Sequence, residues 1–375
     1  MTDVLIAGAG PSGAIAAIVL ARAGVRVLVL DRARFPRPKL CGDTINPGAY
    51  AVLQRLGLEV AAARALPIDG MVVTGGEGVR VEGRYGEAHG YSISRTDLDL
   101  ALLQAAAGAG ARIEQEALVD APLMDTTRGE VVSGVIVKGR QGRAFRMAAR
   151  MTIAADGRYS RVARALKLSC SPLRPRRWAI GSYFQDVAAV TSLGEMHVRR
   201  GHYLGVAPLP GGICNACVVT PHPGPGTPRE ILTHALGQDP QLRDRFAGAR
   251  MVVEPISLGP LAVDCRAVGM PGLLLAGDAA GFVDPMTGDG LRFAFRGAEL
   301  AALEALHALE HGNHDAHVRL AAARRHAFSA KWRFNRTMRW MVEAPRTLRV
   351  AELGAGVVPS VLQRVIRYAG DLNAA

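Results

Sequence analysis

The first 31 residues alternate between apolar runs and a glycine-rich segment, and this pattern predicts a strand, a turn, a helix and a second strand. Residues 3–7 form a short apolar run that is typical of a buried strand. The glycine-rich segment follows directly, and an apolar, helix-like stretch covers 14–21. A second apolar run over 25–30 then ends on Asp31. A dinucleotide-binding βαβ unit requires its parts in this order.

The glycines of the predicted turn have separate roles in binding a pyrophosphate. Gly8 allows the tight turn, Gly10 lets a pyrophosphate approach the backbone, and Gly13 lets the helix pack close to the strand. The N-terminus of the helix supplies unpaired N–H groups and a partial positive charge for the phosphates. Asp31 lies about 20 residues past the turn, where it can accept hydrogen bonds from a ribose diol. On these residues alone the dinucleotide is either NAD or FAD.

A loop with a cysteine follows the βαβ unit. Two prolines and four basic residues make 32–43 an ordered loop rather than a helix, and Cys41 stands beside Gly42 within it. The loop could place the thiol of Cys41 near the cofactor. The alternative is that Cys41 packs as a small buried hydrophobe.

The rest of the chain predicts two groups of short strands and a return to the nucleotide fold. The residues from 176 to 263 indicate a β-rich second domain. A buried strand over 272–276 ends on Gly277-Asp278, and a long helix that begins near Gly290 points its positive end into the same cleft. Strands are expected within 70–94 and over 112–120, 130–137, 150–155, 178–186, 194–199, 202–207 and 212–219, and helices are expected to begin at Pro47, at Arg95 with Thr96 as N-cap, and at Pro228.

Cys214 and Cys217 have the spacing of a redox motif. In a strand, however, residues three apart point to opposite faces of the sheet. No second pair of cysteines exists to complete a metal site. We therefore interpret both cysteines as structural, and no metal site is expected.

Composition narrows the class of protein. The chain has 375 residues, 49% of them hydrophobic and 21% charged, as in an ordinary globular protein with one large or two moderate cores. It has no apolar stretch of membrane-spanning length, and its N-terminus runs straight into the first strand, so we expect neither a membrane span nor a signal peptide. Five scattered cysteines fit a reducing cytosol, which predicts a cytoplasmic protein.

The net charge of +12 is concentrated near the C-terminus. The residues from Arg319 to Arg349 contain nine basic side chains, one acid and several interleaved aromatic residues. No nucleic-acid-binding motif accompanies this charge, so a nucleic acid is not an expected partner. The favoured interpretation is a basic surface helix that touches anionic lipid, which would make the protein peripheral to a membrane. The alternative is a solvated face. The oligomeric state is left open.

Three stretches together resemble the FAD-dependent oxidoreductases related to para-hydroxybenzoate hydroxylase. They are the glycine-rich turn, the mid-chain strand end at Asp156-Gly157 and the late strand end at Gly277-Asp278. More narrowly, the sequence resembles the geranylgeranyl reductase family over about residues 1–310. The stretches that carry this closer resemblance are 35–43 with Pro47, 91–99 with Arg95, and 277–285 with Gly288 and Gly290.

The resemblance implies an α/β fold: a Rossmann-like FAD-binding domain, an inserted β-rich substrate domain and a helical C-terminus. The implied boundaries are 1–70, 91–170 and 266–310 for the discontinuous FAD-binding domain, 71–90 and 171–265 for the substrate domain, and 311–375 for the helical region. FAD would bind in extended form. NAD(P)H would visit as a transient reductant, because no second GxGxxG segment exists to hold it.

The resemblance also implies a role for particular residues. Asp31 would hold the adenosine ribose, Arg95 would meet the pyrophosphate, and Asp278 would contact the pyrophosphate or ribityl region. Gly290 and Leu291 would donate backbone N–H groups to the flavin ring. The full cofactor-binding set is Gly8, Gly10, Pro11, Ser12, Gly13, Asp31, Arg32, Lys39, Cys41, Gly42, Arg95, Val119 (beside the adenine), Gly277, Asp278, Gly288, Gly290 and Leu291, and Cys41 is also the candidate catalytic residue.

One segment departs from the reductase pattern. The reductases carry Tyr-x-Trp-x-Phe-Pro along the isoprenoid channel, whereas this chain has Gly205 and Ala207 in place of the Trp and Phe. Tyr203, Gly205, Ala207 and Pro208 are the expected substrate residues, in a pocket made wider by the loss of two rings. The paired tryptophans of flavin halogenases are also missing, so halogenation is not expected.

The leading functional prediction is an FAD-dependent oxidoreductase that uses NAD(P)H to reduce a carbon–carbon double bond. The substrate would be a hydrophobic small molecule that resembles an isoprenoid or a polyketide. The alternative is an FAD-dependent monooxygenase that hydroxylates an aromatic or polyketide substrate. An electron-transfer flavoprotein that docks through the basic face is a third possibility.

Overall fold

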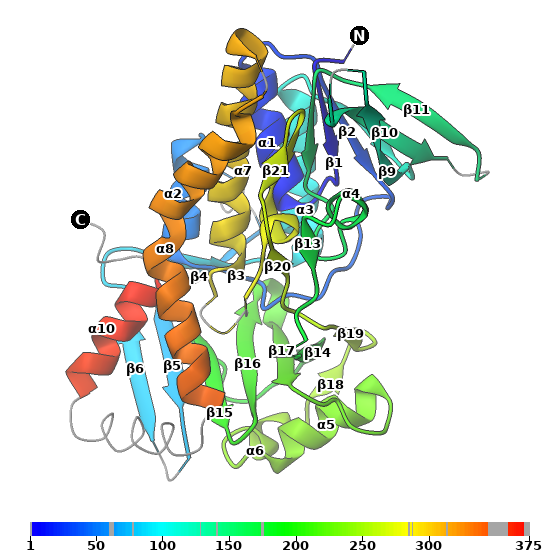
Figure 1. The fold of residues 1–375 in the computed structure, drawn as a ribbon. Coiled ribbons are helices and arrows are strands. Elements are labelled where there is room, and N and C mark those ends of the chain that lie inside the picture. Colours follow the sequence, from blue (N-terminus) through cyan, green and yellow to red (C-terminus); the bar gives the residue numbers. More distant parts are fainter. Residues whose placement is uncertain are drawn as a thin grey trace.

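The N-terminal βαβ unit forms the centre of a six-stranded sheet in the computed structural model (Figure 1), which describes residues 2–59, 64–76, 79–127, 129–139, 142–173, 176–283, 286, 288–312, 314–343 and 359–370. The strand order is β21-β22-β12-β1-β2-β8, and every pairing is parallel except that of β21 at one edge. The central strands β1, β2, β12 and β22 are largely apolar and buried because both faces of the sheet are covered there, whereas the edge strand β8 is partly exposed. Their bounds are β1 Val4–Ala7, β2 Val27–Asp31, β8 Arg112–Gln115, β12 Met151–Ala154, β21 Gly269–Met270 and β22 Leu273–Leu275.

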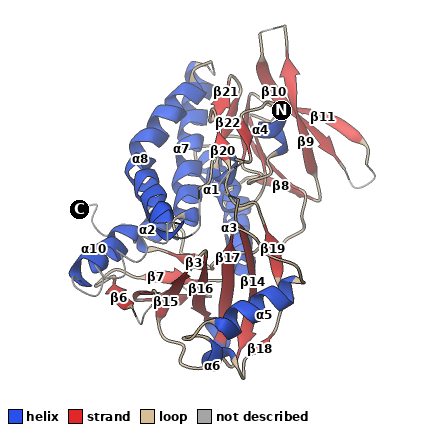
Figure 2. Ribbon diagram, turned by 60° about the horizontal axis from the view of Figure 1, so that its bottom comes forward, coloured by secondary structure: helices blue, strands red, loops and turns tan. Residues whose placement is uncertain are grey.

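Alternate residues of β1 belong to two different cores. Ile6 packs with the helices on one face, and Leu5 packs with a small antiparallel sheet on the other. Figure 2 shows these layers from a second direction. The helices are α1 Pro11–Arg22, α3 Arg95–Gly108 and α7 Gly290–His311, and the small sheet consists of β9 Leu118–Asp125, β10 Val131–Lys138 and β11 Ala144–Ala148.

A second large sheet lies beyond the carboxyl ends of the parallel strands (Figure 1). Its order is β18-β14-β17-β16-β15-β5-β6, with β19 also paired to β14. Helices α5 (Pro228–Gln238) and α6 (Arg243–Phe246) cover one face through an apolar cluster, and the other face is turned toward the nucleotide fold. The strands are β5 Gly70–Thr74, β6 Arg80–Arg84, β14 Trp178–Gln185, β15 Leu193–Arg199, β16 His202–Leu209, β17 Ile213–Thr220, β18 Arg250–Met251 and β19 Ile256–Leu258.

The C-terminal helices connect the two sheets. Helix α8 (Ala316–Glu343) packs along α7 and extends toward the second sheet, where α10 (Pro359–Ala369) lies against β6 (Figure 1). The smaller elements are α2 Pro47–Arg55, α4 Arg161–Ala165, the 3₁₀ turns η1 Pro210–Gly212 and η2 Gly277–Ala280, a sheet of β3 Thr44–Ile45, β7 Gly90–Ser92 and β4 Leu66–Ile68, and a pair of β13 Ser169–Cys170 and β20 Asp264–Cys265.

The predicted fold class is confirmed, and several local predictions are corrected. The N-cap of α3 is Ser94, whose Oγ accepts a hydrogen bond from the Asp97 N–H at 3.1 Å, so Thr96 as N-cap was wrong. The strand expected over 112–120 is broken into β8 and β9 at Glu116, whose φ of 61° no strand allows. The division into domains at the boundaries given above stays a prediction.

Candidate active site

A cavity of about 320 Å³ lies between the nucleotide fold and the second sheet. Its walls come from the glycine-rich turn, the 39–46 loop, the inner face of the second sheet, the start of α7, and the two C-terminal helices. Cavities at the carboxyl ends of parallel strands are where α/β proteins bind their ligands. The cavity therefore lies where the sequence predicts the dinucleotide.

The glycine-rich turn has the geometry that a pyrophosphate requires. Gly8 has a φ of 97°, and a Cβ added at Gly13 would lie 1.8 Å from the Gly8 carbonyl oxygen, so both positions need glycine for the fold itself. A Cβ at Gly10 would instead meet only Nη2 of Arg37, at 3.6 Å. Gly10 thus leaves open space at the start of α1, where the first N–H groups have no intrahelical acceptor. A phosphate fits there.

Basic side chains surround this turn. Arg95 is buried and donates to both carboxylate oxygens of Asp99, at 2.7 and 2.9 Å, and Arg37 lies 3.4 Å from the same carboxylate. Arg158 lies 3.5 Å from Asp278. Lys39 also lines the cavity, and burial beside Arg95 lowers the pKa of its ammonium group to about 8.

In the described chain the four cations Arg37, Lys39, Arg95 and Arg158 outnumber the carboxylates of Asp31, Asp99 and Asp278 around the turn, which leaves positive charge for a pyrophosphate. Among the described residues, one nitrogen of the buried Arg158 guanidinium has no hydrogen-bond partner. The residues present therefore fit FAD. Sequence reasoning did not select Arg37 or Arg158, although Arg37 stands in the quoted 35–43 motif and Arg158 follows the Asp156-Gly157 strand end.

The structure gathers most, but not all, of the predicted residues at the cavity wall. Arg32 is exposed, and Val119 is buried among the core residues beneath the parallel sheet. Asp31 accepts hydrogen bonds from the backbone N–H groups of Ala9, at 2.7 Å, and Ala33, at 2.8 Å, beside the glycine-rich turn. The predicted residues that line the cavity are Gly10, Pro11, Ser12, Lys39, Cys41, Gly42, Arg95, Asp278, Gly288, Gly290, Leu291, Tyr203, Gly205 and Ala207, and those that do not are Gly8, Gly13, Asp31, Arg32, Val119, Gly277 and Pro208.

Gly277 does not line the cavity, but it affects the shape of the site through a close contact with the start of α1. A Cβ added at Gly277 would lie 2.3 Å from Oγ of Ser12, and its φ is 61°. Glycine at this position lets the end of β22 approach the start of α1 closely. The approach brings Asp278 into the cavity wall beside the glycine-rich turn.

The inner face of the second sheet carries the predicted substrate residues. Tyr203, Gly205 and Ala207 alternate along β16 and line the cavity, whereas Pro208 belongs to the opposite set of alternating residues. A Cβ at Gly205 would meet Sγ of Cys217 at 3.5 Å, an ordinary contact. Side chains larger than glycine would therefore extend from this position into the cavity.

The Cys-x-x-Cys segment behaves as predicted, with its two thiols on opposite faces of β17. Cys214 packs beneath α5, and Cys217 lines the cavity. Burial raises the pKa of the Cys217 thiol to about 12, so it is neutral. Its position at the cavity wall was not predicted, because it depends on which face of the strand turns inward.

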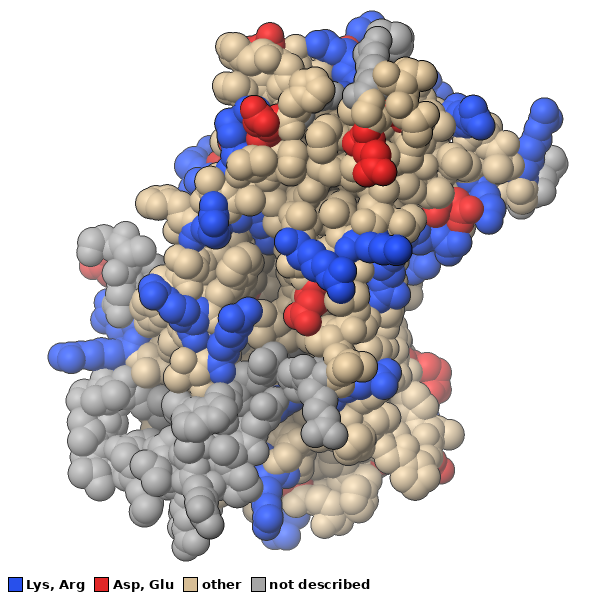
Figure 3. Space-filling model, viewed as in Figure 1, with Lys and Arg blue, Asp and Glu red and all other residues tan. Residues whose placement is uncertain are grey.

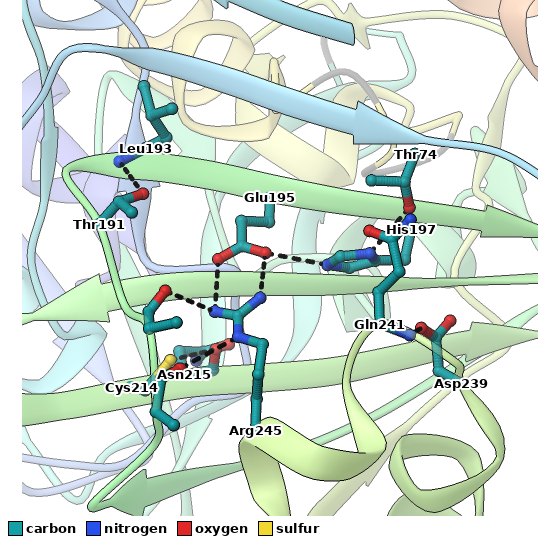
Figure 4. Close-up of polar contacts among 12 residues, drawn as sticks. Thr74, Thr191, Leu193, Glu195, His197, Cys214, Asn215, Asp239, Gln241 and Arg245 are labelled. Atoms are coloured by element: carbon teal, nitrogen blue, oxygen red, sulfur yellow. Dashed lines mark hydrogen bonds and ion pairs between the residues drawn. The ribbon is translucent and has the colours of Figure 1, made fainter. Parts of the chain in front are cut away.

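A polar network in the second sheet has its side chains mainly on the face turned from the cavity, although Glu195 is among the residues that line the cavity. Figure 4 shows Glu195 between Arg245, which donates two hydrogen bonds at 2.6 and 2.8 Å, and the His197 ring, at 3.1 Å. The side chains of Glu195 and His197 point to the face of β15 that α5 and α6 cover. Met196 and Val198 alternate with them and line the cavity from the opposite face. Burial alone would raise the pKa of Glu195, but the two partners lower it to about 2. The network stabilises the sheet rather than supplying an acid or base to the cavity.

Two cations of the stretch predicted to be a surface helix are buried. Arg324 and Lys331 are 2% and 3% exposed, because helical spacing puts them on the inner face of α8 with Leu320, Phe328 and Asn335. Exposed cations remain at Arg325, Arg333 and Arg336. Figure 3 shows basic side chains on the surface over α8, at the left of the view. Arg346 and Arg349 lie outside the described residues, as do Asp284 and Pro285 of the late motif and the side chains of Arg339 and Trp340.

Lys331 fastens α10 to the rest of the protein. Its ammonium group donates to the carbonyl oxygens of Tyr368 and, at 2.9 Å, Ala369. Nδ2 of Asn46 donates to the same Ala369 oxygen at 3.3 Å. Ile366 of α10 packs on β6, where a Cβ added at Gly83 would approach it to 2.6 Å. These contacts place Val365, Ile366 and Ala369 in the cavity wall, together with Phe334 and Met338 of α8.

Neither a metal-binding cluster nor a membrane-spanning helix is present in the described part of the chain. Within it, no group of three or more His, Cys, Asp or Glu side chains could hold a metal ion. None of its helices is long and apolar enough to cross a membrane.

Comparisons with known proteins agree with this geometry. Residues 1–243 match the family model described as "FAD binding domain". The chain is 31% identical to menaquinone reductase of Mycobacterium tuberculosis over 80% of its own length and 75% of that protein. It is 30% identical to digeranylgeranylglycerophospholipid reductase 2 of Methanopyrus kandleri, over 82% and 78%. It is also 27% identical to conditioned medium factor receptor 1 of Dictyostelium discoideum, over 82% of the chain but only 63% of that protein.

Solved structures share the fold. A geranylgeranyl bacteriochlorophyll reductase-like protein from Thermoplasma acidophilum superimposes with a TM-score of 0.81 at 20% identity, covering 98% of this chain and 91% of that one. A mutant of the flavin-dependent brominase Bmp2 gives a TM-score of 0.86 at 20% identity, covering 99% and 94%. At these identities the likeness concerns the fold alone.

Proposed function

The chain belongs to the FAD-binding-domain family as a geranylgeranyl reductase-like FAD-dependent oxidoreductase, and on that premise we propose that it reduces a carbon–carbon double bond of a hydrophobic substrate. The substrate would be an isoprenoid-like or polyketide-like molecule. NAD(P)H would be the transient reductant.

The observation that carries this proposal is the apolar wall opposite the glycine-rich turn. Beyond Cys41 the cavity continues along the inner face of the second sheet, where most of the side chains that line it are apolar. A hydrophobic chain would bury its surface there and exclude water. The wall includes Ala179, Val198, Val219, Leu258, Leu261 and Met338.

The basic end of the cavity would hold the cofactor. The N–H groups at the start of α1, with Lys39 and Arg95, would bind the pyrophosphate. The free N–H groups of Gly290 and Leu291 at the start of α7 would face the flavin ring. Bound FAD supplies a carrier that accepts two electrons from a nicotinamide and passes them on. The residues of the chain orient the substrate beside this carrier and keep water away.

The names of two relatives support a reductase over a hydroxylase. One is a menaquinone reductase, and the other is a reductase of a digeranylgeranylglycerophospholipid, so both names describe reduction of molecules that carry isoprenoid chains. The apolar wall suits such a chain in this protein too. A location at a membrane surface would give access to it, and the exposed arginines of α8 would serve that association.

The decisive experiment is the mass of the product. Purified protein with FAD and NADPH or NADH is incubated with a hydrophobic extract while oxygen uptake is recorded. A product heavier by two hydrogens, formed without stoichiometric oxygen uptake, is expected. A product heavier by one oxygen, with matching oxygen uptake, would instead assign the monooxygenase reaction.

Cys41 provides a test of the reacting end of the cavity. Cys41→Ala should keep FAD bound, because it leaves the glycine-rich turn, Lys39, Arg95 and the start of α7 unchanged, but should lower kcat about tenfold or more, or alter the product, if the thiol faces the reacting bond. Cys217→Ala is the matched control, since Cys217 also lines the cavity but lies on the second sheet. Equal kinetics of wild type and Cys41→Ala would reduce Cys41 to a packing role.

A further inference from the structure

Asp43 is an acid with no exposed surface, placed two residues after Cys41. Its Oδ1 accepts a hydrogen bond from the backbone N–H of Arg95 at 3.2 Å, and its Oδ2 accepts one from Nδ2 of Asn215 at 2.7 Å. The guanidinium group of Arg95 donates to Asp99, as described above, and also to the sulfur of Cys41. Within the described residues Asp43 thus has hydrogen-bond donors but forms no ion pair. A buried acid in such a site is costly to ionise.

Cys41 is tied to the same polar site. Nδ2 of Asn215 also donates to the carbonyl oxygen of Cys41 at 3.0 Å. Burial raises the pKa of the Cys41 thiol, Arg95 lowers it, and the Asp43 carboxylate raises it again, while the Asp43 N–H donates to the sulfur. Across the described elements, the charged or titratable groups that face Cys41 are Arg95 of α3, Asp43 of its own loop, Tyr183 of β14 and Cys217 of β17.

The two acids ionise in a fixed order. Burial is the main influence on Asp43 and raises the pKa of its carboxyl to about 7, although hydrogen bonds from Tyr183 and Asn215 lower it. The thiol of Cys41 ionises at higher pH, since burial and the Asp43 carboxylate both raise its pKa. When Asp43 becomes negative, it opposes a second negative charge on the neighbouring sulfur.

We propose that Asp43 is a positioning residue that fixes Cys41 at the cavity wall and adds to the effect of burial in keeping its thiol neutral. Its backbone N–H and its partner Asn215 hold Cys41 in place, and its carboxylate opposes loss of the thiol proton. This inference rests on the proposed function, because a neutral thiol can donate a hydrogen bond to a substrate beside it and a thiolate cannot.

The test follows alkylation of Cys41 by iodoacetamide in the FAD-loaded protein from about pH 6 to about pH 10. Peptide mass mapping measures Cys41 separately, with the exposed Cys170 as internal reference. Asp43→Asn should lower the midpoint of Cys41 alkylation by about one pH unit, because it removes a neighbouring negative charge. The exchange variant Asp43→Asn with Asn215→Asp returns the acid to the pair and should move the midpoint back. Cys170 should not respond to either change.

An unchanged Cys41 midpoint in Asp43→Asn, at the FAD content of wild type, would overturn the proposal. If that variant fails to fold or loses FAD, the wild-type profile decides the matter. Its Cys41 alkylation should deviate from a single titration, with an inflection near pH 7 where Asp43 ionises, and a one-group curve would refute the coupling. None of these measurements needs a substrate. Their outcome therefore tests the role of Asp43 independently of the proposed reduction of a double bond.

Discussion

Replacing Gly10 by valine separates the binding of FAD from the folding of the chain. The backbone at Gly10 has φ −68° and ψ −177°, which a β-branched residue adopts without strain. The nearest atom to an added Cβ is the flexible end of Arg37, at 3.6 Å. We therefore expect Gly10→Val to change the stability of the cofactor-free protein by no more than about 0.5 kcal/mol. The valine side chain would nevertheless fill the space into which a pyrophosphate must come.

The magnitude follows from linkage. FAD at about 1,000 times its Kd stabilises the wild type by about 4 kcal/mol. At about 2.1 cal/mol/K per residue, the unfolding entropy of 375 residues is about 0.8 kcal/mol/K, so that is a rise in Tm of about 5 °C. In Gly10→Val this rise should be lost, while the Tm without FAD stays at the wild-type value.

The assay is thermal melting with and without FAD, together with the flavin absorbance of the purified protein. Two glycines serve as controls. Gly108→Ala should behave as wild type, since a Cβ there meets no atom within 4 Å, and Gly13→Ala should lower the Tm without FAD, since its Cβ would overlap the Gly8 carbonyl. A Gly10→Val protein that keeps stoichiometric FAD would refute the assignment of this turn to the pyrophosphate.

Three further results are expected. Gly205→Trp should keep FAD but slow turnover of a bulky natural substrate relative to a linear geranylgeranyl compound, because the ring fills cavity space near Cys217; equal rates for wild type and variant on both substrates would contradict the pocket argument. The double variant Arg333→Glu with Arg336→Glu should bind anionic vesicles about 30-fold or more weakly at low salt, because each lost cation removes about 1 kcal/mol of binding free energy. The control variant Arg146→Glu, on β11, should bind as the wild type does. Equal binding of the wild type to neutral and anionic vesicles would count against a membrane role. Glu195→Gln should flatten the acid side of the stability profile. The pKa of Glu195 is lowered from 4.5 to about 2, so the Glu195 carboxylate stabilises the fold above about pH 4.5 and this stabilisation is lost as pH falls toward 2. The free energy of unfolding, measured with urea, should change by about 3 kcal/mol over this range in the wild type. Parallel profiles for the two proteins would show that the network does not stabilise the sheet.

The sequence predicts the geometry of the glycine-rich turn well because local patterns determine it. Gly8, Gly10 and Gly13 act within a single turn, so their spacing alone indicates what they do. The fold class follows in the same way from apolar runs and their order. Glu116 is the instructive failure, because its φ of 61° separates two strands that the apolar pattern joins.

The substrate end could not be predicted to the same depth, because its residues meet only in the folded chain. Asn215 approaches Asp43 from 172 positions away. Nothing in the sequence says that Cys217, rather than Cys214, faces the cavity. Two cations of the basic stretch could not be placed for a similar reason: charge can be counted along a sequence, but the burial of Arg324 and Lys331 depends on which face of the helix packs inward.

The fastening of α10 has a consequence for how such a protein can diversify. The segment that resembles the reductase family ends at about residue 310, whereas Val365, Ile366 and Ala369 close one side of the cavity from beyond that point. One side of the cavity is thus encoded in a stretch of the gene apart from the residues predicted to bind the cofactor. Exchange or remodelling of the last stretch can change which molecules fit while every FAD contact stays as it was. Relatives with the same nucleotide fold can therefore be expected to differ in substrate size according to their C-terminal helices.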